Sequence, residues 1–168
     1  QGLSWKKMSD AVAGGTGPHY YQELYTSPHE FDKLYLVDNY MQVSNDGGKT
    51  FTRMNESEKH VDNHAIAFKK SDPNYILVGC DGGLYESFDK TENWKFVDNL
   101  PLTQFYKIAV DDAEPFYNVY GGTQDNNTQG APSRTDNIHG IRNSDWFVVL
   151  GGDGHQPATE PVSYTHLR

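Results

Sequence analysis

The sequence predicts an all-β protein that is built from repeated four-stranded units. Short runs rich in β-branched and aromatic residues, such as "LYLV" and "YILVGC", stand between clusters of turn-forming residues. The 168 residues include 11 Tyr, 8 Phe and 3 Trp, and no stretch follows the i, i+3, i+4, i+7 spacing of an amphipathic helix. One segment also recurs at a fixed distance along the chain, which is typical of repeat architectures.

The stretch "SNDGGKTF", residues 44–51, predicts a hairpin between two of these strands. Asp46 can accept hydrogen bonds from backbone N–H groups of its own turn, and Gly47 and Gly48 can adopt positive φ without a Cβ clash. A calcium loop is the alternative, but an EF-hand loop that starts at Asp46 needs a glutamate at its twelfth position, where Ser57 stands. We therefore expect a turn here and no metal site.

An internal repeat sets the architecture. Residues 34–51 fall without a gap on residues 77–94 after a shift of 43, and residues 65–79 fall on 107–121 after a shift of 42. A fainter copy covers 22–37. Each unit reads as four short strands in about 40 to 45 residues, which is the length of a β-propeller blade. We expect about three four-stranded antiparallel blades between residues 19 and 161, within a partial propeller domain at 1–161.

The two ends of the chain suggest a part of something longer. The first residues, "QGLSW", lack a methionine, and "VSYTHLR" at 162–168 replaces the strand expected after Pro161. We interpret this tail as foreign sequence after a truncated reading frame. The expected partners therefore include the remaining blades of a parent chain.

Composition excludes several functional classes. The 14 basic and 23 acidic residues give a net charge of −9, which would repel a nucleic-acid backbone. No apolar run approaches the length of a membrane span, and no signal segment opens the fragment. Cys80 is the only cysteine, so no intrachain disulfide can form, and its apolar surroundings predict a buried small residue. No residue pattern predicts a cofactor.

The turn motif carries a family resemblance. Residues 44–51 resemble the Asp-box, the bacterial neuraminidase repeat S-x-D-x-G-x-T-W/F, and residues 87–94 resemble a degenerate second copy. Together with the repeated strand motifs between residues 19 and 161, they are similar to large secreted propellers grouped with xyloglucanase-like glycosyl hydrolases and with the sortilin-type propeller. The resemblance implies a structural role for the Asp-box residues, namely Ser44, Asp46, Gly48, Thr50, Phe51, Ser87, Asp89 and Trp94.

The same resemblance implies an extracellular or periplasmic location and a polysaccharide or a protein ligand on one propeller face. It leaves two functions open. The first is a glycoside hydrolase that acts on polysaccharide, and the second is a non-catalytic, sortilin-like module that binds proteins or peptides.

Blade topology separates the loops by face. Loops between second and third strands emerge with the blade-to-blade connections, whereas the Asp-rich hairpins emerge on the opposite face. The motif D-x-H stands at the expected start of a first strand twice, at 62–64 and 153–155. It could hold a metal, form a general acid pair or make a blade-joining hydrogen bond. Because no third ligand stands at a standard spacing, we predict no metal site. Asp81, in "DGG", reads as a hairpin residue.

The candidate catalytic residues are Asp125 and Asp153, as base and acid, because repeated loop carboxylates can carry out glycoside hydrolysis. We expect the substrate-binding residues on the same face to be His64, Arg142, Trp146 and His155. A core position is the alternative for Trp146. Arg142 alone does not resemble the three-arginine cluster of sialidases.

Overall fold

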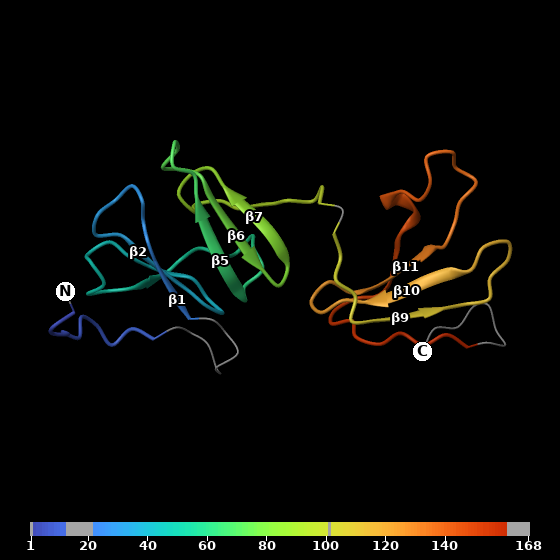
Figure 1. Ribbon diagram of the computed structural model, residues 1–168, viewed down its shortest axis with the longest axis horizontal. Coiled ribbons are helices and arrows are strands. Elements are labelled where there is room, and N and C mark those ends of the chain that lie inside the picture. Colours follow the sequence, from blue (N-terminus) through green and yellow to red (C-terminus); the bar gives the residue numbers. More distant parts are fainter. Residues whose placement is uncertain (1, 13–21, 101, 161–168) are drawn as a thin grey trace. The chain divides into compact units, whose positions relative to one another are not determined.

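The computed structural model describes residues 2–12, 22–100 and 102–160, and it places them in three four-stranded antiparallel sheets (Figure 1). The first sheet contains β1 (Glu23–Thr26), β2 (Leu34–Val37), β3 (Gln42–Ser44) and β4 (Thr52–Arg53). The second contains β5 (Asn63–Phe68), β6 (Ile76–Cys80), β7 (Gly83–Ser87) and β8 (Lys95–Phe96). The third contains β9 (Lys107–Val110), β10 (Asn118–Gly122), β11 (Thr128–Pro132) and β12 (Phe147–Leu150), with one short 3-10 helix, η1 (Asn143–Asp145), before β12. The predicted all-β class is confirmed.

Each sheet is a meander in which strands adjacent in sequence are adjacent in space. This is the strand order of a propeller blade, so the chain is three blades of a β-propeller. The repeat seen in the sequence matches the strands closely: a shift of 43 residues carries β4 onto β8, and a shift of 42 carries β6 onto β10. The tail at 162–168, interpreted above as foreign sequence, lies outside the described residues.

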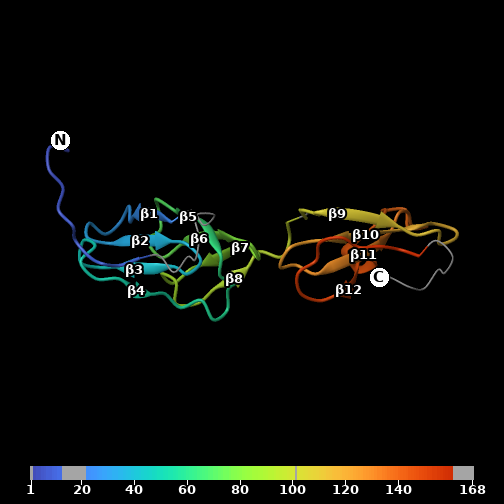
Figure 2. The ribbon, with the colours of Figure 1, turned by 90° about the horizontal axis from the view of Figure 1, so that it is seen from below.

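The chain divides into two compact units, Gln1–Leu100 (unit 1) and Pro101–Arg168 (unit 2). Unit 1 contains the first two sheets, whose strand order can be followed in Figure 2. The two sheets share one core: Tyr35, Val37, Met41, Met54, Ile66, Ile76, Val78 and Trp94 are all buried in it. The rings of Tyr35 on β2 and Phe68 on β5 lie 5.2 Å apart and join the sheets directly.

The core follows the two-residue period of the strands. In β2, Tyr35 and Val37 are buried while Leu34 and Leu36 are only half-buried, and Ile76 and Val78 repeat this pattern in β6. Burying large apolar side chains of this kind contributes about 1.5–3 kcal/mol each relative to exposure. The alternation therefore fixes which faces of the two sheets meet.

The turn at residues 44–51 is closed by its own side chains. The Ser44 hydroxyl donates to Asp46 Oδ1 over 2.8 Å and accepts the Gly48 N–H over 2.9 Å. Asp46 also accepts the N–H of Thr50 at 3.0 Å and its hydroxyl at 2.7 Å. Gly47 and Gly48 have φ of 72° and 85°, where a Cβ would be strained.

The turn at 88–94 repeats this geometry with different residues. Ser87 donates to Asp89 over 2.9 Å, and the Asn93 side-chain amide takes the place of the threonine hydroxyl, 2.7 Å from Asp89 Oδ2. Lys90 and Thr91 have φ of 58° and 80° without being glycines. The hydrogen bonds at the serine and the aspartate thus persist where the glycines do not, and Trp94 packs into the core at 7% exposure.

Unit 2 contains the third sheet. Tyr120 and Ala131 are buried in it. A Cβ added at Gly130 would lie 2.8–2.9 Å from the rings of Tyr120 and Phe147, so the glycine admits both rings over β11. The opposite face carries the exposed side chains of Ile108 and Val148.

Candidate functional site

The strand order gives each sheet two distinct ends. We call the end with the second-to-third-strand loop the loop end; it comprises residues 38–41, 62–64 and 81–82 in unit 1, and 123–127 and 151–155 in unit 2. The other end of unit 1 carries the turns at 45–51 and 88–94 and is called the turn end. Asp46 and Asp89 therefore lie opposite the loop end of their sheets, as the strand sequence predicts.

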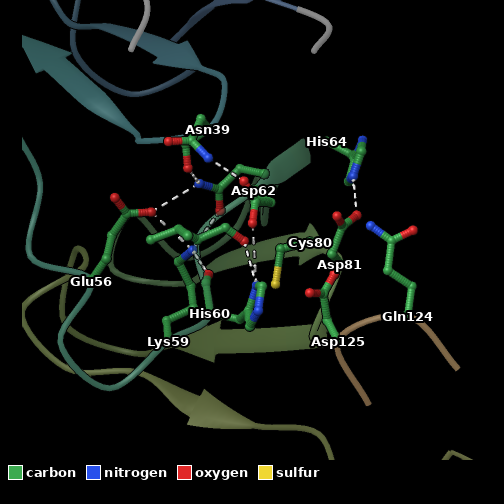
Figure 3. Close-up of polar contacts among 12 residues, drawn as sticks. Asn39, Glu56, Lys59, His60, Asp62, His64, Cys80, Asp81, Gln124 and Asp125 are labelled. Atoms are coloured by element: carbon green, nitrogen blue, oxygen red, sulfur yellow. Dashed lines mark hydrogen bonds and ion pairs between the residues drawn. The ribbon is translucent and has the colours of Figure 1, made fainter. Parts of the chain in front are cut away.

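At the loop end of unit 1, His64 and Asp81 form a close pair. His64 Nε2 lies 2.5 Å from Asp81 Oδ1, and the two side chains are 37% and 25% exposed (Figure 3). Asp81 stands in the short connection between β6 and β7, so the sequence located the turn, but nothing in it indicated the histidine partner. Cys80 precedes this connection half-buried, and burial raises the pKa of its thiol.

A buried ion pair lies behind these loops. Lys59 Nζ is 3.0 Å from Glu56 Oε1, and the two side chains are 0% and 2% exposed. Asn63 joins the pair, because its amide donates to Glu56 over 2.9 Å and its oxygen accepts from Lys59. Glu56 Oε2 also accepts the Met41 N–H over 3.2 Å. The network links the segment before β5 to the connection after β2.

The sequence indicates this network only weakly. Glu56 and Lys59 stand in "ESEK", a short charged stretch of the kind usually found on a solvated surface. Only the i, i+3 spacing of opposite charges indicated a pair.

At the loop end of unit 2, the structure brings Asp125 and Asp153 together. Asp153 Oδ1 accepts the backbone N–H of Asp125 over 2.9 Å. The two loops are further joined by the Gly154 N–H, which donates to Thr123 O over 2.9 Å, and by the Asn127 N–H, which donates to Gly152 O over 2.9 Å. Asp125 has a φ of 59°, so the loop turns sharply at this residue.

Aromatic side chains lie beside the two loops. The rings of Tyr106 and His155 are 5.2 Å apart and tilted by 47°, and the Tyr106 hydroxyl bonds to Gln124 Oε1. Tyr106 is 47% exposed. His155 was predicted at this face from the sequence. Tyr106 was not, although it directly precedes β9 and so lies where the first strand of this sheet begins.

Trp146 and Arg142 precede β12, whereas Asp153 follows it, and the shared face expected of Trp146 and the two aspartates remains a prediction. β12 pairs with β11 from Phe147 opposite Gly130 to Leu150 opposite Thr128. Trp146 precedes this strand and Asp153 follows it, so the strand separates them. Trp146 stacks on Phe105, 6.0 Å away at 19°, and remains 37% exposed, so it is not a core residue of unit 2. Arg142 Nη2 donates to Asn137 Oδ1 over 3.2 Å.

The described residues, 2–12, 22–100 and 102–160, contain no group of three or more His, Cys, Asp or Glu side chains placed to hold a metal ion. Within the same ranges, no helix has the length and apolar character that crossing a bilayer requires.

Comparisons with known proteins give solved structures only; no protein-family model and no curated protein matches the sequence. The chain is similar to the GH74 enzyme of Niastella koreensis, at 16% identity and a TM-score of 0.41, over 81% of this chain and 23% of that one. It is also similar to YCF48 from Cyanidioschyzon merolae, at 17% identity and a TM-score of 0.35, over 77% of this chain and 44% of that one. The chain thus spans less than half the length of either protein.

Proposed function

We propose that the chain is part of a secreted Asp-box propeller of glycosyl-hydrolase type, whose loop end binds a polysaccharide. The observation that carries the proposal is the group at the loop end of unit 2, where Tyr106 and His155 lie beside Gln124, Asp125 and Asp153. A half-exposed aromatic ring offers an apolar face to a sugar ring, and neighbouring amide and carboxylate oxygens can accept hydrogen bonds from its hydroxyls.

Hydrolysis needs two carboxyl groups across the glycosidic bond, about 5–5.5 Å apart for retention or about 6.5–9.5 Å for inversion. In this chain the candidates are Asp125 and Asp153, which lie on adjoining loops. His155 would contact the substrate in the same place, and His64 would serve the loop end of unit 1.

A second candidate function is a non-catalytic propeller that binds a protein or peptide ligand. One observation favours it: the carboxylates at the loop ends already have structural partners. Asp153 accepts a backbone N–H, and Asp81 is paired with His64.

The test of polysaccharide binding is a panel of plant and bacterial glycans, measured by calorimetry with the protein and with Tyr106→Ala. We expect one glycan class to bind, and Tyr106→Ala to weaken it by about tenfold or more, equivalent to a loss of roughly 1.4 kcal/mol. Tyr117→Ala is the matched control, because Tyr117 is 50% exposed but precedes β10 at the other end of the sheet.

Equal affinities for the protein and for Tyr106→Ala would overturn the proposed site. Failure to bind any glycan would overturn the proposed ligand class and favour the second candidate. Release of reducing sugar from the bound glycan separates a hydrolase from a binding module.

A further inference from the structure

The two D-x-H motifs make the same connection to the sheet that precedes them. In unit 1, the N–H of Asn63 donates to Asp38 O over 3.1 Å. In unit 2, the N–H of Gly154 donates to Thr123 O over 2.9 Å. Asp38 directly follows β2 and Thr123 directly follows β10, so both acceptors stand just after a second strand.

The aspartate of each motif adds a side-chain bond to the same loop. Asp62 Oδ1 accepts the side-chain amide of Asn39, and Asp153 Oδ1 accepts the backbone N–H of Asp125 over 2.9 Å. The donors differ in kind, but in each unit they belong to the second-to-third-strand loop of the preceding sheet. The two units show this arrangement independently of each other.

The middle residue differs between the two D-x-H motifs because its surroundings differ. Asn63 is fully buried and bonds to Glu56, whereas a Cβ at Gly154 would lie 2.5 Å from Asn127 O and 2.8 Å from Thr123 N. The motif in unit 2 therefore has no space for a side chain at its middle position. We call the hydrogen bonds between a D-x-H motif and the preceding second-to-third-strand loop a junction, and the aspartate bond is the side-chain feature that both junctions share.

We infer that Asp62 and Asp153 are positioning residues, whose carboxylates hold the neighbouring second-to-third-strand loop, and that neither acts as an acid or a base. The inference rests on the proposed function, because the loop held by Asp153 carries Asp125 and Gln124 at the proposed ligand site. It changes the role expected of Asp153 and leaves Asp125 as the candidate for chemistry in unit 2.

Acceptance of a hydrogen bond and transfer of a proton make different demands on residue 153. An acceptor needs an oxygen at the Oδ1 position, which asparagine keeps and alanine lacks. An acid or a base needs an ionisable carboxyl group, which both substitutions remove. Comparison of the two substitutions at one position therefore separates the roles.

The experiment measures glycan affinity and turnover, together with hydrogen exchange at the Asp125 amide, for Asp153→Asn and Asp153→Ala. We expect Asp153→Asn to keep the slow exchange of the Asp125 amide, because its side-chain oxygen can still accept that N–H, and to lose less glycan affinity and turnover than Asp153→Ala. We expect Asp153→Ala to speed exchange at the Asp125 amide and to weaken glycan binding at least about fivefold. Asp136→Ala is the control, because Asp136 is exposed in the connection between β11 and β12.

Equal loss of turnover in both variants, with exchange at the Asp125 amide unchanged, would overturn the inference and assign chemistry to Asp153. Unchanged exchange in Asp153→Ala would overturn it whether or not a glycan binds. If no glycan binds but exchange responds as expected, only the proposed ligand class fails. Asp62→Asn and Asp62→Ala repeat the test in unit 1, where the residue-62 amide donates to Asn39 O over 2.8 Å and serves as reporter.

Discussion

At the scale of single residues, Asp46 shows how one side chain holds a turn. The backbone N–H of Thr50, its hydroxyl and the Ser44 hydroxyl all donate to the Asp46 carboxylate, and they hold its pKa well below the usual aspartate range. A carboxyl group whose pKa is lowered by folding stabilises the folded state while it is ionised. Its contribution is therefore present above the pKa of the unfolded state and is lost as the pH falls through the lower pKa of the folded state.

We predict that Asp46→Ala lowers the urea midpoint of unit 1 at neutral pH. The difference from the parent protein should stay constant down to about pH 4, the ordinary aspartate range, and then narrow as the pH falls further. Urea unfolding followed by fluorescence at several pH values measures this. Asp98→Ala, an exposed aspartate in the connection after β8, is the control. A difference that widens toward low pH would contradict the prediction.

Single residues also show where sequence reasoning succeeds. The types in "SNDGGKTF" predicted a turn because the conformational needs of glycine and the acceptor capacity of aspartate are local properties. The replacement of the threonine hydroxyl by the Asn93 amide could not be predicted, since it depends on the amide reaching the same oxygen across the turn.

At the scale of elements, the buried pair of Glu56 and Lys59 connects the two sheets of unit 1. It lies between the connection after β2 and the start of β5, where the Met41 N–H and the Asn63 amide also bond to Glu56. Removing one partner of such a pair leaves an uncompensated charge in a low-dielectric site.

We predict that Glu56→Ala destabilises unit 1 by about 3–5 kcal/mol, because Lys59 remains buried without its counter-ion. Chemical denaturation measures the change, and Glu58→Ala is the control, because Glu58 is exposed two residues away. The double variant Glu56→Leu, Lys59→Met should recover much of the loss, since it removes both charges. A loss below about 1 kcal/mol for Glu56→Ala would show that the pair is dispensable.

The elements also decide how far the candidate site could be predicted. Sorting loops by strand end correctly brought Asp125 near Asp153, because the loop after a second strand and the connection after a fourth strand emerge together. Trp146 was assigned from its chemical type beside Arg142, without its place relative to β12, and that assignment remains a prediction. Tyr106 and Lys59 were missed because their positions depend on packing between loops that sequence spacing does not encode.

At the scale of the whole molecule, the blade repeat was predictable and its packing was not. The 42–43-residue period, the β-branched runs and the turn residues are recorded in the sequence of every unit, so they predicted three meander sheets. How much of each sheet face is buried depends on the surfaces that pack against it, and the repeat pattern does not encode those surfaces. On the third sheet, Ile108, Val110 and Val148 are 64%, 51% and 62% exposed.

We predict that the purified 168-residue chain self-associates and binds a hydrophobic dye through this face, because contiguous exposed apolar surface is a common cause of association. Ile108→Lys combined with Val148→Lys should reduce both effects and leave the far-ultraviolet spectrum unchanged. Sedimentation velocity over a range of concentrations measures the association. Persistence of the same association in the double variant would exclude this face as its cause.

The hydrogen bonds of the D-x-H junctions limit which insertions, deletions and duplications such a chain can accept in evolution. In each of the two junctions, the loop after a second strand receives an aspartate that stands 23 or 28 residues further along the chain. Duplication of a segment that contains both halves would therefore copy a complete junction. Insertions and deletions outside these two segments would leave both junctions intact, whereas a shift of a few residues between Asn39 and Asp62, or between Asp125 and Asp153, would break one.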